Sequence, residues 1–161
     1  MKAWVLLLHL LVPQFVLAQG WHHTANAQVF YNPFGAPDGE LLVESTRRAL
    51  DQLTLLTGAT LGYGGGTIHT DKPNAVVISY APRSQVERYC RKGAAACAVM
   101  TSYIDAPYFK NVKILLSDDL PMNCLQAVLL HELGHAYRLD HSEDSTHFMF
   151  PGVKCLNTPD S

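Results

Sequence analysis

The sequence lacks any excess of positive charge. Its 12 lysine and arginine residues stand against 14 aspartate and glutamate residues, which gives a formal net charge of −2. Removal of residues 1–18 would take away Lys2 and no acidic residue, leaving 11 basic and 14 acidic residues and a net charge of −3. Binding to nucleic acid through phosphate contacts requires a basic surface. The composition therefore predicts no nucleic-acid partner.

The sequence also lacks internal repeats, long linkers and an unbroken apolar run of membrane-spanning length. Residues 1–18, MKAWVLLLHLLVPQFVLA, carry one positive charge and an apolar run that His9, Pro13 and Gln14 interrupt. A membrane span needs roughly 18 to 20 uninterrupted apolar residues, whereas this pattern is typical of a secretory signal peptide. We expect residues 19–161 to form one compact monomeric domain, secreted to the extracellular space or the periplasm, without stable membrane insertion.

Hydrophobic periodicity indicates two helices. The first runs from Asp38, a plausible N-cap, to Gly58, a natural stop. Its apolar residues share one face: Leu42, Ala49, Leu50, Leu53 and Leu56. The second begins near Asp118 or Asp119, with Pro121 in its first turn. This helix carries an apolar stripe on one face and two histidines, His131 and His135, on another. Such a pattern is typical of a helix at the floor of a cleft. The stripe consists of Leu125, Leu129, Leu133 and Ala136.

Three short runs are typical of strands, namely residues 74–82, Ala98–Ile104 and Val112–Ser117. The first is rich in β-branched residues and is bounded by prolines, which indicates a buried strand. The preceding triplet Gly64–Gly66 is interpreted as a turn.

Four cysteines lie beyond residue 18: Cys90, Cys97, Cys124 and Cys155. An even number of cysteines in an exported chain favours disulfide bonds. Of the three possible pairings, we prefer Cys90 with Cys97. Cys124 then pairs with Cys155, which ties the start of the second helix to the end of the chain. Four unpaired thiols in a reducing compartment are the alternative.

The segment HELGH, residues 131–135, carries the strongest chemical signal. Two histidines four residues apart on a helix lie about 40° apart around the axis and about 6 Å apart along it, so both can reach one metal ion. Glu132 lies about 100° further round, where it reaches a metal-bound water more easily than the ion. Two surface histidines on an amphipathic helix are the alternative interpretation.

A third histidine can join His131 and His135 only if the helix ends early. On a straight helix His141 would point away from the ion, so the chain must first leave the helix, usually through a residue with positive φ. Arg138 occupies the expected exit, where an L-residue costs on the order of 1 to 2 kcal/mol. Metal binding, at roughly 10 kcal/mol, outweighs this cost. We therefore expect a strained turn with His141 as the third ligand.

The segment HELGHAYRLDHS, followed by Met149 and Pro151, resembles the matrixin branch of the metzincin zinc peptidases, whose pattern is HExxHxxGxxHS with a downstream Met-turn. The similarity covers residues 121–152, and Arg138 replaces the glycine of the pattern. It implies an α+β, metzincin-like zincin fold. In that fold a small mixed β-sheet packs on two long helices, with the active-site helix under the cleft and a short C-terminal Met-turn segment.

The resemblance also implies a secreted zinc-dependent endopeptidase with one catalytic Zn²⁺ on the three histidines. Glu132 would be the general base toward a zinc-activated water that hydrolyses a peptide bond. Met149 would pack beneath the metal, and Phe150 and Pro151 would form a wall of the substrate pocket. A protein or peptide substrate would pair with an exposed edge strand, for which Ala98–Tyr103 is our candidate.

Several questions stay open at this point. A non-catalytic zinc-scaffold binding protein and a zinc amidase acting on a non-protein amide are alternatives, although the retained glutamate favours an enzyme. If the exit turn fails, Asp140 and His147 are the substitute ligands.

No segment of the sequence matches the structural-zinc and calcium loops of matrixins. Calcium binding is therefore open, and His69 and Asp71 are predicted surface residues. No cysteine precedes the first helix to block the zinc, so the enzyme is secreted active or restrained by a separate inhibitor protein.

Overall fold

The computed structural model describes residues 27–102, 109–153 and 155, and the expected signal peptide lies outside them. The class is α+β, as the sequence predicts. The elements in chain order are β1 (Gln28–Tyr31), α1 (Gly39–Thr57), β2 (Gly62–Gly66), β3 (Ala75–Ala81), α2 (Arg83–Tyr89), β4 (Ala96–Ser102), β5 (Phe109–Ser117), the 3₁₀ turn η1 (Met122–Cys124) and α3 (Leu125–Ala136). None of the described helices combines the length and the apolar content that a membrane span requires.

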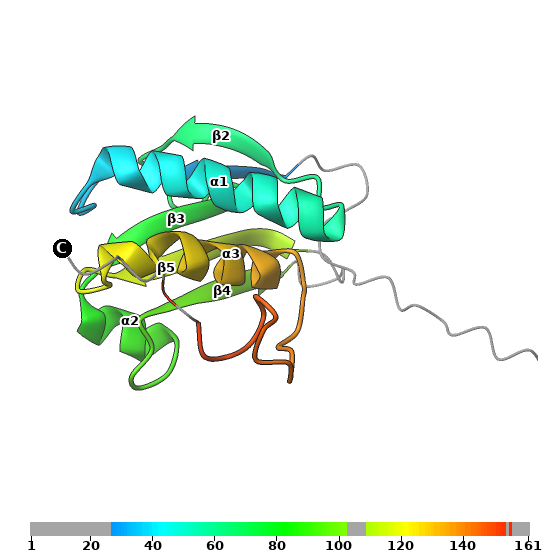
Figure 1. The fold of residues 1–161 in the computed structure, drawn as a ribbon. Helices are drawn as coiled ribbons and strands as arrows, with labels where there is room; N and C mark the ends of the chain where they lie inside the picture. Colours follow the sequence, from blue (N-terminus) through cyan, green and yellow to red (C-terminus); the bar gives the residue numbers. More distant parts are fainter. Residues whose placement is uncertain (1–26, 103–108, 154, 156–161) are drawn as a thin grey trace, which may run out of the picture.

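The five strands form one mixed sheet in the order β2-β1-β3-β5-β4. β1 pairs in parallel with β2 and β3, β3 pairs in parallel with β5, and β4 runs antiparallel to β5. The helices α1 and α3 lie side by side across one face of this sheet (Figure 1). Among the described strands β4 pairs with β5 alone, so β4 is an edge strand as predicted for Ala98–Tyr103; Tyr103 itself lies outside the described residues.

Helix α1 begins and ends next to the residues that the sequence predicts as its N-cap and its stop. The Asp38 side chain accepts a hydrogen bond from the backbone N–H of Leu41 at 2.9 Å, and Gly58 ends the helix with a φ of 72°. Leu42 and Leu53 are fully buried in the core, whereas Leu56 is 53% exposed, so the predicted apolar stripe stops one turn early.

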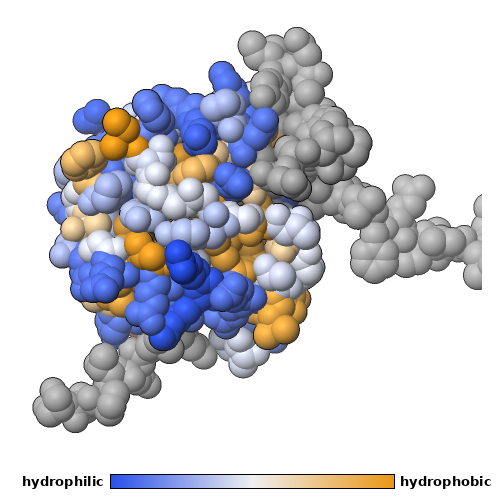
Figure 2. All heavy atoms as spheres, turned by 90° about the horizontal axis from the view of Figure 1, so that it is seen from above, coloured by the Kyte–Doolittle hydropathy of each residue, from blue (hydrophilic) through white to orange (hydrophobic). Residues whose placement is uncertain are grey.

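Seen from the side of β2 and α1, the surface is mixed, with small, separate apolar patches among hydrophilic side chains (Figure 2).

The helix α3 begins later than the sequence predicts, at Leu125 and not near Asp118 or Asp119. The backbone N–H of Asp118 donates to the carbonyl of Ala81 at 3.0 Å, which continues the sheet register. Pro121 has a ψ of 132°, an extended conformation that starts η1 and not an α-helix. The hydrogen bond of Asp118 is made with a strand that is distant in sequence. The local proline signal does not reflect it, so the predicted helix start was wrong by one to two turns.

Four of the described elements were not expected, namely β1, β2, α2 and η1, and the predicted turn at Gly64–Gly66 is part of strand β2. An ideal Cβ placed on Gly64 would overlap the ring of Phe30, which belongs to the neighbouring strand β1. The aromatic cover of β2 therefore comes from another strand, and β2 shows no hydrophobic alternation of its own. The short helix α2 buries only Val86, which leaves little periodicity to detect.

Both expected disulfide bonds are present, Cys90 with Cys97 and Cys124 with Cys155. The second links the start of α3 to a residue 31 positions later. On the chain-entropy model, removing it by a double alanine substitution should lower the free energy of unfolding by about 3.7 kcal/mol. The shorter Cys90–Cys97 loop should contribute about 2.5 kcal/mol on the same model. Chemical denaturation of the two double variants measures the difference, and equal losses would argue against loop closure as the source.

Candidate metal centre

Three imidazoles converge at the end of α3. His135 Nε2 lies 3.2 Å from His131 Nε2 and 3.1 Å from His141 Nε2. His131 is buried, His135 half-buried and His141 exposed, so the cluster opens toward solvent on one side. The three histidines that the sequence singled out form a group that can hold a metal ion.

Hydrogen bonds to the other ring nitrogens determine what these Nε2 atoms offer. His131 Nδ1 lies 3.0 Å from the carbonyl oxygen of Phe148, and His135 Nδ1 lies 2.9 Å from that of Leu139. A carbonyl oxygen only accepts hydrogen bonds, so each Nδ1 must carry the proton and each neutral ring presents a lone pair at Nε2. Burial lowers the pKa of both His131 and His135, which favours these neutral forms.

The contact between His131 Nε2 and His135 Nε2 is therefore not a hydrogen bond in the neutral cluster. Two lone pairs at about 3 Å repel each other unless a cation lies between them. Nitrogen ligands at about 2.05 Å from a tetrahedral ion are separated by roughly 3.3 Å, close to the spacing of these atoms. The donor chemistry and the spacing thus fit a bound divalent metal, and the second-ring hydrogen bonds are those that orient metal-binding histidines.

The turn that brings His141 back to the cluster passes through Arg138, whose φ is 69°. The N–H of Arg138 donates to the carbonyl of His135 at 2.8 Å, and the N–H of Leu139 donates to that of Gly134 at 2.9 Å. This pair of hydrogen bonds is the Schellman motif, which ends helices with a left-handed residue. Arginine thus performs the exit that glycine usually performs, and His141 joins the cluster as expected.

The substitute ligands are not needed, because the turn holds. Asp140 and His147 lie outside the cluster of histidines. His147 Nδ1 instead accepts a hydrogen bond from the backbone N–H of Met149 at 3.1 Å.

Arg138→Gly should leave the metal content unchanged and alter stability by less than about 1 kcal/mol. Glycine relieves the strain of positive φ, worth about 1 to 2 kcal/mol. The variant loses the contact of the guanidinium with the Phe109 ring, 4.9 Å from its centroid, and gains freedom in the unfolded chain. Arg138→Ala keeps the strain and loses the contact, so it should be the less stable variant. Metal analysis and thermal unfolding of both variants test this, and metal bound only by the glycine variant would show a defective natural turn.

The segment around Met149 packs under α3 at Gly134. Met149 is only 1% exposed, and an ideal Cβ on Gly134 would overlap its sulfur. Met149 therefore occupies the space that the missing side chain leaves, behind the helix that carries the histidines. Of the two predicted pocket-wall residues, Pro151 lines the cleft described below. Phe150 packs its ring beside Gly152 and is not among the lining residues.

Glu132 is a buried carboxylate beside the cluster, with 6% of its surface exposed. Its Oε2 atom has no hydrogen-bond partner in the described part of the chain. Burial raises the pKa of this carboxyl to about 7, although the backbone N–H of Ala98 acts in the opposite direction. A carboxyl group with a pKa near neutrality can both accept and release a proton under physiological conditions.

This raised pKa predicts that Glu132 destabilises the metal-free fold as the pH increases. The carboxyl titrates near 4.5 when unfolded and at about 7 when folded, so its contribution is neutral below pH 4.5 and unfavourable above 7. The full penalty is roughly 3 kcal/mol. Glu132→Gln removes it, so the variant should exceed the wild type in stability at about pH 8 but not at about pH 4.5. His131 and His135, whose lowered pKa values act with the opposite sign, are common to both proteins, so their contributions cancel.

Chelator-treated wild type and variant, unfolded by denaturant at both pH values, provide the measurement. A stability difference between the two proteins that does not change with pH would contradict the raised pKa of Glu132.

An open cleft of about 610 Å³ contains the histidine cluster and Glu132. Its walls include the start of β4, the side of α3 and both disulfide bonds, a feature that sequence reasoning missed. The sequence predicted the Cys90–Cys97 disulfide bond, but no local sequence pattern indicated that the resulting loop lies beside the histidines.

His69 and Asp71 lie outside the cleft, at the surface as predicted. Asp71 pairs with Lys113 at 2.5 Å, and this contact lowers the pKa of its carboxyl.

No protein-family model matches this sequence, and a search of curated proteins gives no match. The chemistry of the cleft is therefore inferred from its own geometry.

Proposed function

We propose that this chain is a secreted zinc-dependent endopeptidase of the metzincin type. The observation that carries the proposal is the convergence of three imidazole nitrogens beside the unpartnered carboxylate oxygen of Glu132 in an open cleft. A structural zinc site normally has four protein ligands. Here three histidines form the donor set among the described residues, and a carboxylate lies next to them, which favours catalysis over a structural role.

Zinc is the metal that this donor set suits best. Three neutral imidazoles with an open position are typical of catalytic zinc, which lowers the pKa of a bound water and polarises a carbonyl group. His131, His135 and His141 would hold the ion. The carbonyl oxygens of Phe148 and Leu139 would keep the first two rings in the required orientation.

The remaining steps of peptide hydrolysis can be assigned to this chain's own groups. Glu132 takes a proton from the attacking water and passes it to the amine of the leaving peptide. Strand β4 offers a free edge beside the cleft, where an extended peptide can pair through its backbone. Burial of Glu132 excludes bulk water from its carboxylate and strengthens the electrostatic interactions of that group.

The two disulfide bonds fit an extracellular protein. We therefore place the activity outside the producing cell or in the periplasm, on a protein or peptide substrate, with control by a separate inhibitor protein as one means of protecting the cell.

Cleavage of an unbiased peptide mixture by the oxidised mature protein tests the proposal. The protein is loaded with one equivalent of zinc and run beside a chelated sample, Glu132→Ala and the matched control Glu143→Ala, which removes an exposed carboxylate outside the cluster. We expect cuts from the wild type and from Glu143→Ala only. If nothing is cut while zinc remains bound, the binding-protein interpretation replaces this one. Hydrolysis of non-peptide amides alone would instead indicate an amidase.

A further inference from the structure

A closed loop between Cys90 and Cys97, here called the 90–97 loop, forms one wall of the cleft. Its disulfide bond joins Cα atoms 5.9 Å apart, and its tip is a tight turn in which Ala94 N–H donates to the carbonyl of Arg91 at 3.0 Å. Arg91 is among the residues that line the cleft. Apart from the histidines, Arg91 and Glu132 are the only ionisable side chains among the described lining residues that can carry charge.

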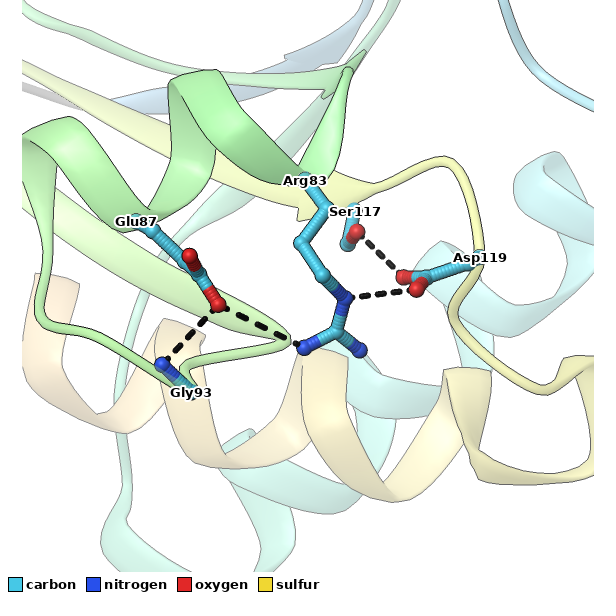
Figure 3. Close-up of polar contacts among 5 residues, drawn as sticks. All are labelled: Arg83, Glu87, Gly93, Ser117 and Asp119. Atoms are coloured by element: carbon cyan, nitrogen blue, oxygen red, sulfur yellow. Dashed lines mark hydrogen bonds and ion pairs between the residues drawn. The ribbon is translucent and has the colours of Figure 1, made fainter.

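The 90–97 loop is held in place by a chain of polar contacts (Figure 3). The Glu87 carboxylate accepts from the N–H of Gly93 at 3.0 Å and lies 3.9 Å from the guanidinium of Arg83. Arg83 in turn pairs with Asp119 at 2.5 Å, and Asp119 accepts a hydrogen bond from the Ser117 hydroxyl. The loop is thereby tied both to α2 and to the turn that follows β5. A wall that is fixed in this way can select among ligands because it does not readily rearrange.

Because of these contacts, the carboxylates of Glu87 and Asp119 are already paired and do not neutralise other charges of the loop. Arg83 is paired with two carboxylates, Glu87 and Asp119. By contrast, Arg91 and Lys92 are exposed, and neither forms an ion pair within the described residues. The rim of the cleft therefore carries the positive charge of Arg91, with Lys92 next to it in the sequence, and no acidic side chain of the described fold forms an ion pair with either residue.

The 90–97 loop lies in the same cleft as the reacting groups, because Arg91 and Glu132 both line it. Ala98, whose backbone N–H lowers the pKa of Glu132, follows Cys97 directly, and Cys97 is bonded to Cys90. With 3.8 Å between consecutive Cα atoms, the Cα atoms of Arg91 and Ala98 are at most about 14 Å apart. An extended peptide covers roughly 3.3 to 3.6 Å per residue, so this distance corresponds to about four residues.

We propose that Arg91, supported by Lys92, makes this site select peptides with an acidic side chain within about four residues of the scissile bond. The inference rests on the proposed function and adds the substrate class. A guanidinium binds a carboxylate through two parallel hydrogen bonds, which favours Asp and Glu over their amides. The other lining residues are mainly small or apolar, among them four alanines, Leu120 and Val128, so small or apolar side chains fit the neighbouring positions.

The test compares matched peptide pairs in which one acidic residue is replaced by its amide. A cleaved sequence is resynthesised with Asp or Asn at each of four positions on either side of the cut, and kcat/KM is measured for the zinc-loaded protein. At one position the wild type should favour the acid by roughly 1.5- to fivefold, the range for an exposed ion pair. Arg91→Ala should bring the ratio near one, Arg91→Glu should invert it, and added salt should weaken it.

Arg88→Ala is the matched control, because Arg88 is an exposed arginine on α2 that does not line the cleft. This variant should keep the wild-type ratio. Binding of the same peptides to zinc-loaded Glu132→Gln, followed by fluorescence anisotropy, gives a readout that does not depend on turnover.

Several outcomes separate this inference from the proposed function. Cleavage with equal rates for acid and amide overturns the substrate preference and leaves the peptidase intact. An acid preference that survives Arg91→Ala assigns it to another group and also overturns the inference. If the wild type cleaves no peptide, the proposed function fails, and the anisotropy measurement decides whether Arg91 still distinguishes acid from amide. Equal peptide affinities, with Arg91-dependent retention on a polyanion, would assign these charges to a polyanionic polymer instead.

Discussion

Glu132→Gln is expected to lower kcat for peptide hydrolysis by about 10²- to 10⁴-fold, the range for loss of a general acid–base group. Glutamine has the same shape as glutamate but cannot accept the proton of the attacking water. Because Glu132 is not part of the histidine cluster, zinc content and KM should remain close to those of the wild type. Steady-state kinetics on one defined peptide, with metal analysis of the same samples, provides the measurement.

Glu143→Gln makes the same chemical change at an exposed carboxylate near the end of α3 and should retain full activity. A Glu132→Gln protein that keeps its rate would remove Glu132 from the mechanism. A protein that loses both rate and zinc would give the carboxylate a role in metal binding instead.

His141→Ala is expected to weaken zinc binding by at least about 100-fold. If the binding free energy of a three-histidine site is roughly 10 kcal/mol, one ligand contributes about 3 kcal/mol. His141 is exposed and lies beyond α3, so the metal-free protein should remain folded. The variant should show a smaller zinc-induced increase in Tm, because ligand stabilisation depends on affinity. Competition against a chromophoric chelator measures the affinity directly.

His69→Ala removes a histidine that lies outside the cluster and should bind zinc as the wild type does. Wild-type affinity in His141→Ala would contradict the assignment of the third ligand. A second substitution at Asp140 or His147 would then show whether either residue has replaced it.

Elements with local signals were predictable from the sequence. The N-cap at Asp38 and the left-handed stop at Gly58 act within a few residues of themselves, and α1 begins and ends where they indicate. The strand around Ala75–Ala81 is buried on both faces and therefore appears as a continuous apolar run. Both disulfide pairs also agree with the prediction from cysteine spacing.

Elements whose signals lie in other parts of the chain were not predictable. Strand β2 consists mostly of glycines, and the ring that covers Gly64 belongs to Phe30 of β1. The start of α3 was misplaced because Asp118 is held by the carbonyl of Ala81, which belongs to a different strand. In both cases the deciding contact joins residues that are far apart in sequence, so local propensity carries no record of it.

The candidate site also has features that the sequence alone determined and features that depend on the tertiary structure. The spacing of His131 and His135 is a property of one helix, so the sequence alone determined that both face the same side. The sequence also determined which side chains can bind metal or transfer a proton, because these properties belong to the residue types themselves.

Tertiary structure decided whether these groups meet in a usable form. Arg138 adopts a φ that its residue type disfavours, and only the Schellman hydrogen bonds and the Phe109 ring show how that conformation is supported. The carbonyl of Phe148 sets the tautomer of His131 from 17 residues away, and burial raises the pKa of Glu132. Burial and long-range hydrogen bonding depend on the surroundings of a side chain in the folded protein, which is why the fold, and not the motif, determines the protonation states of this site.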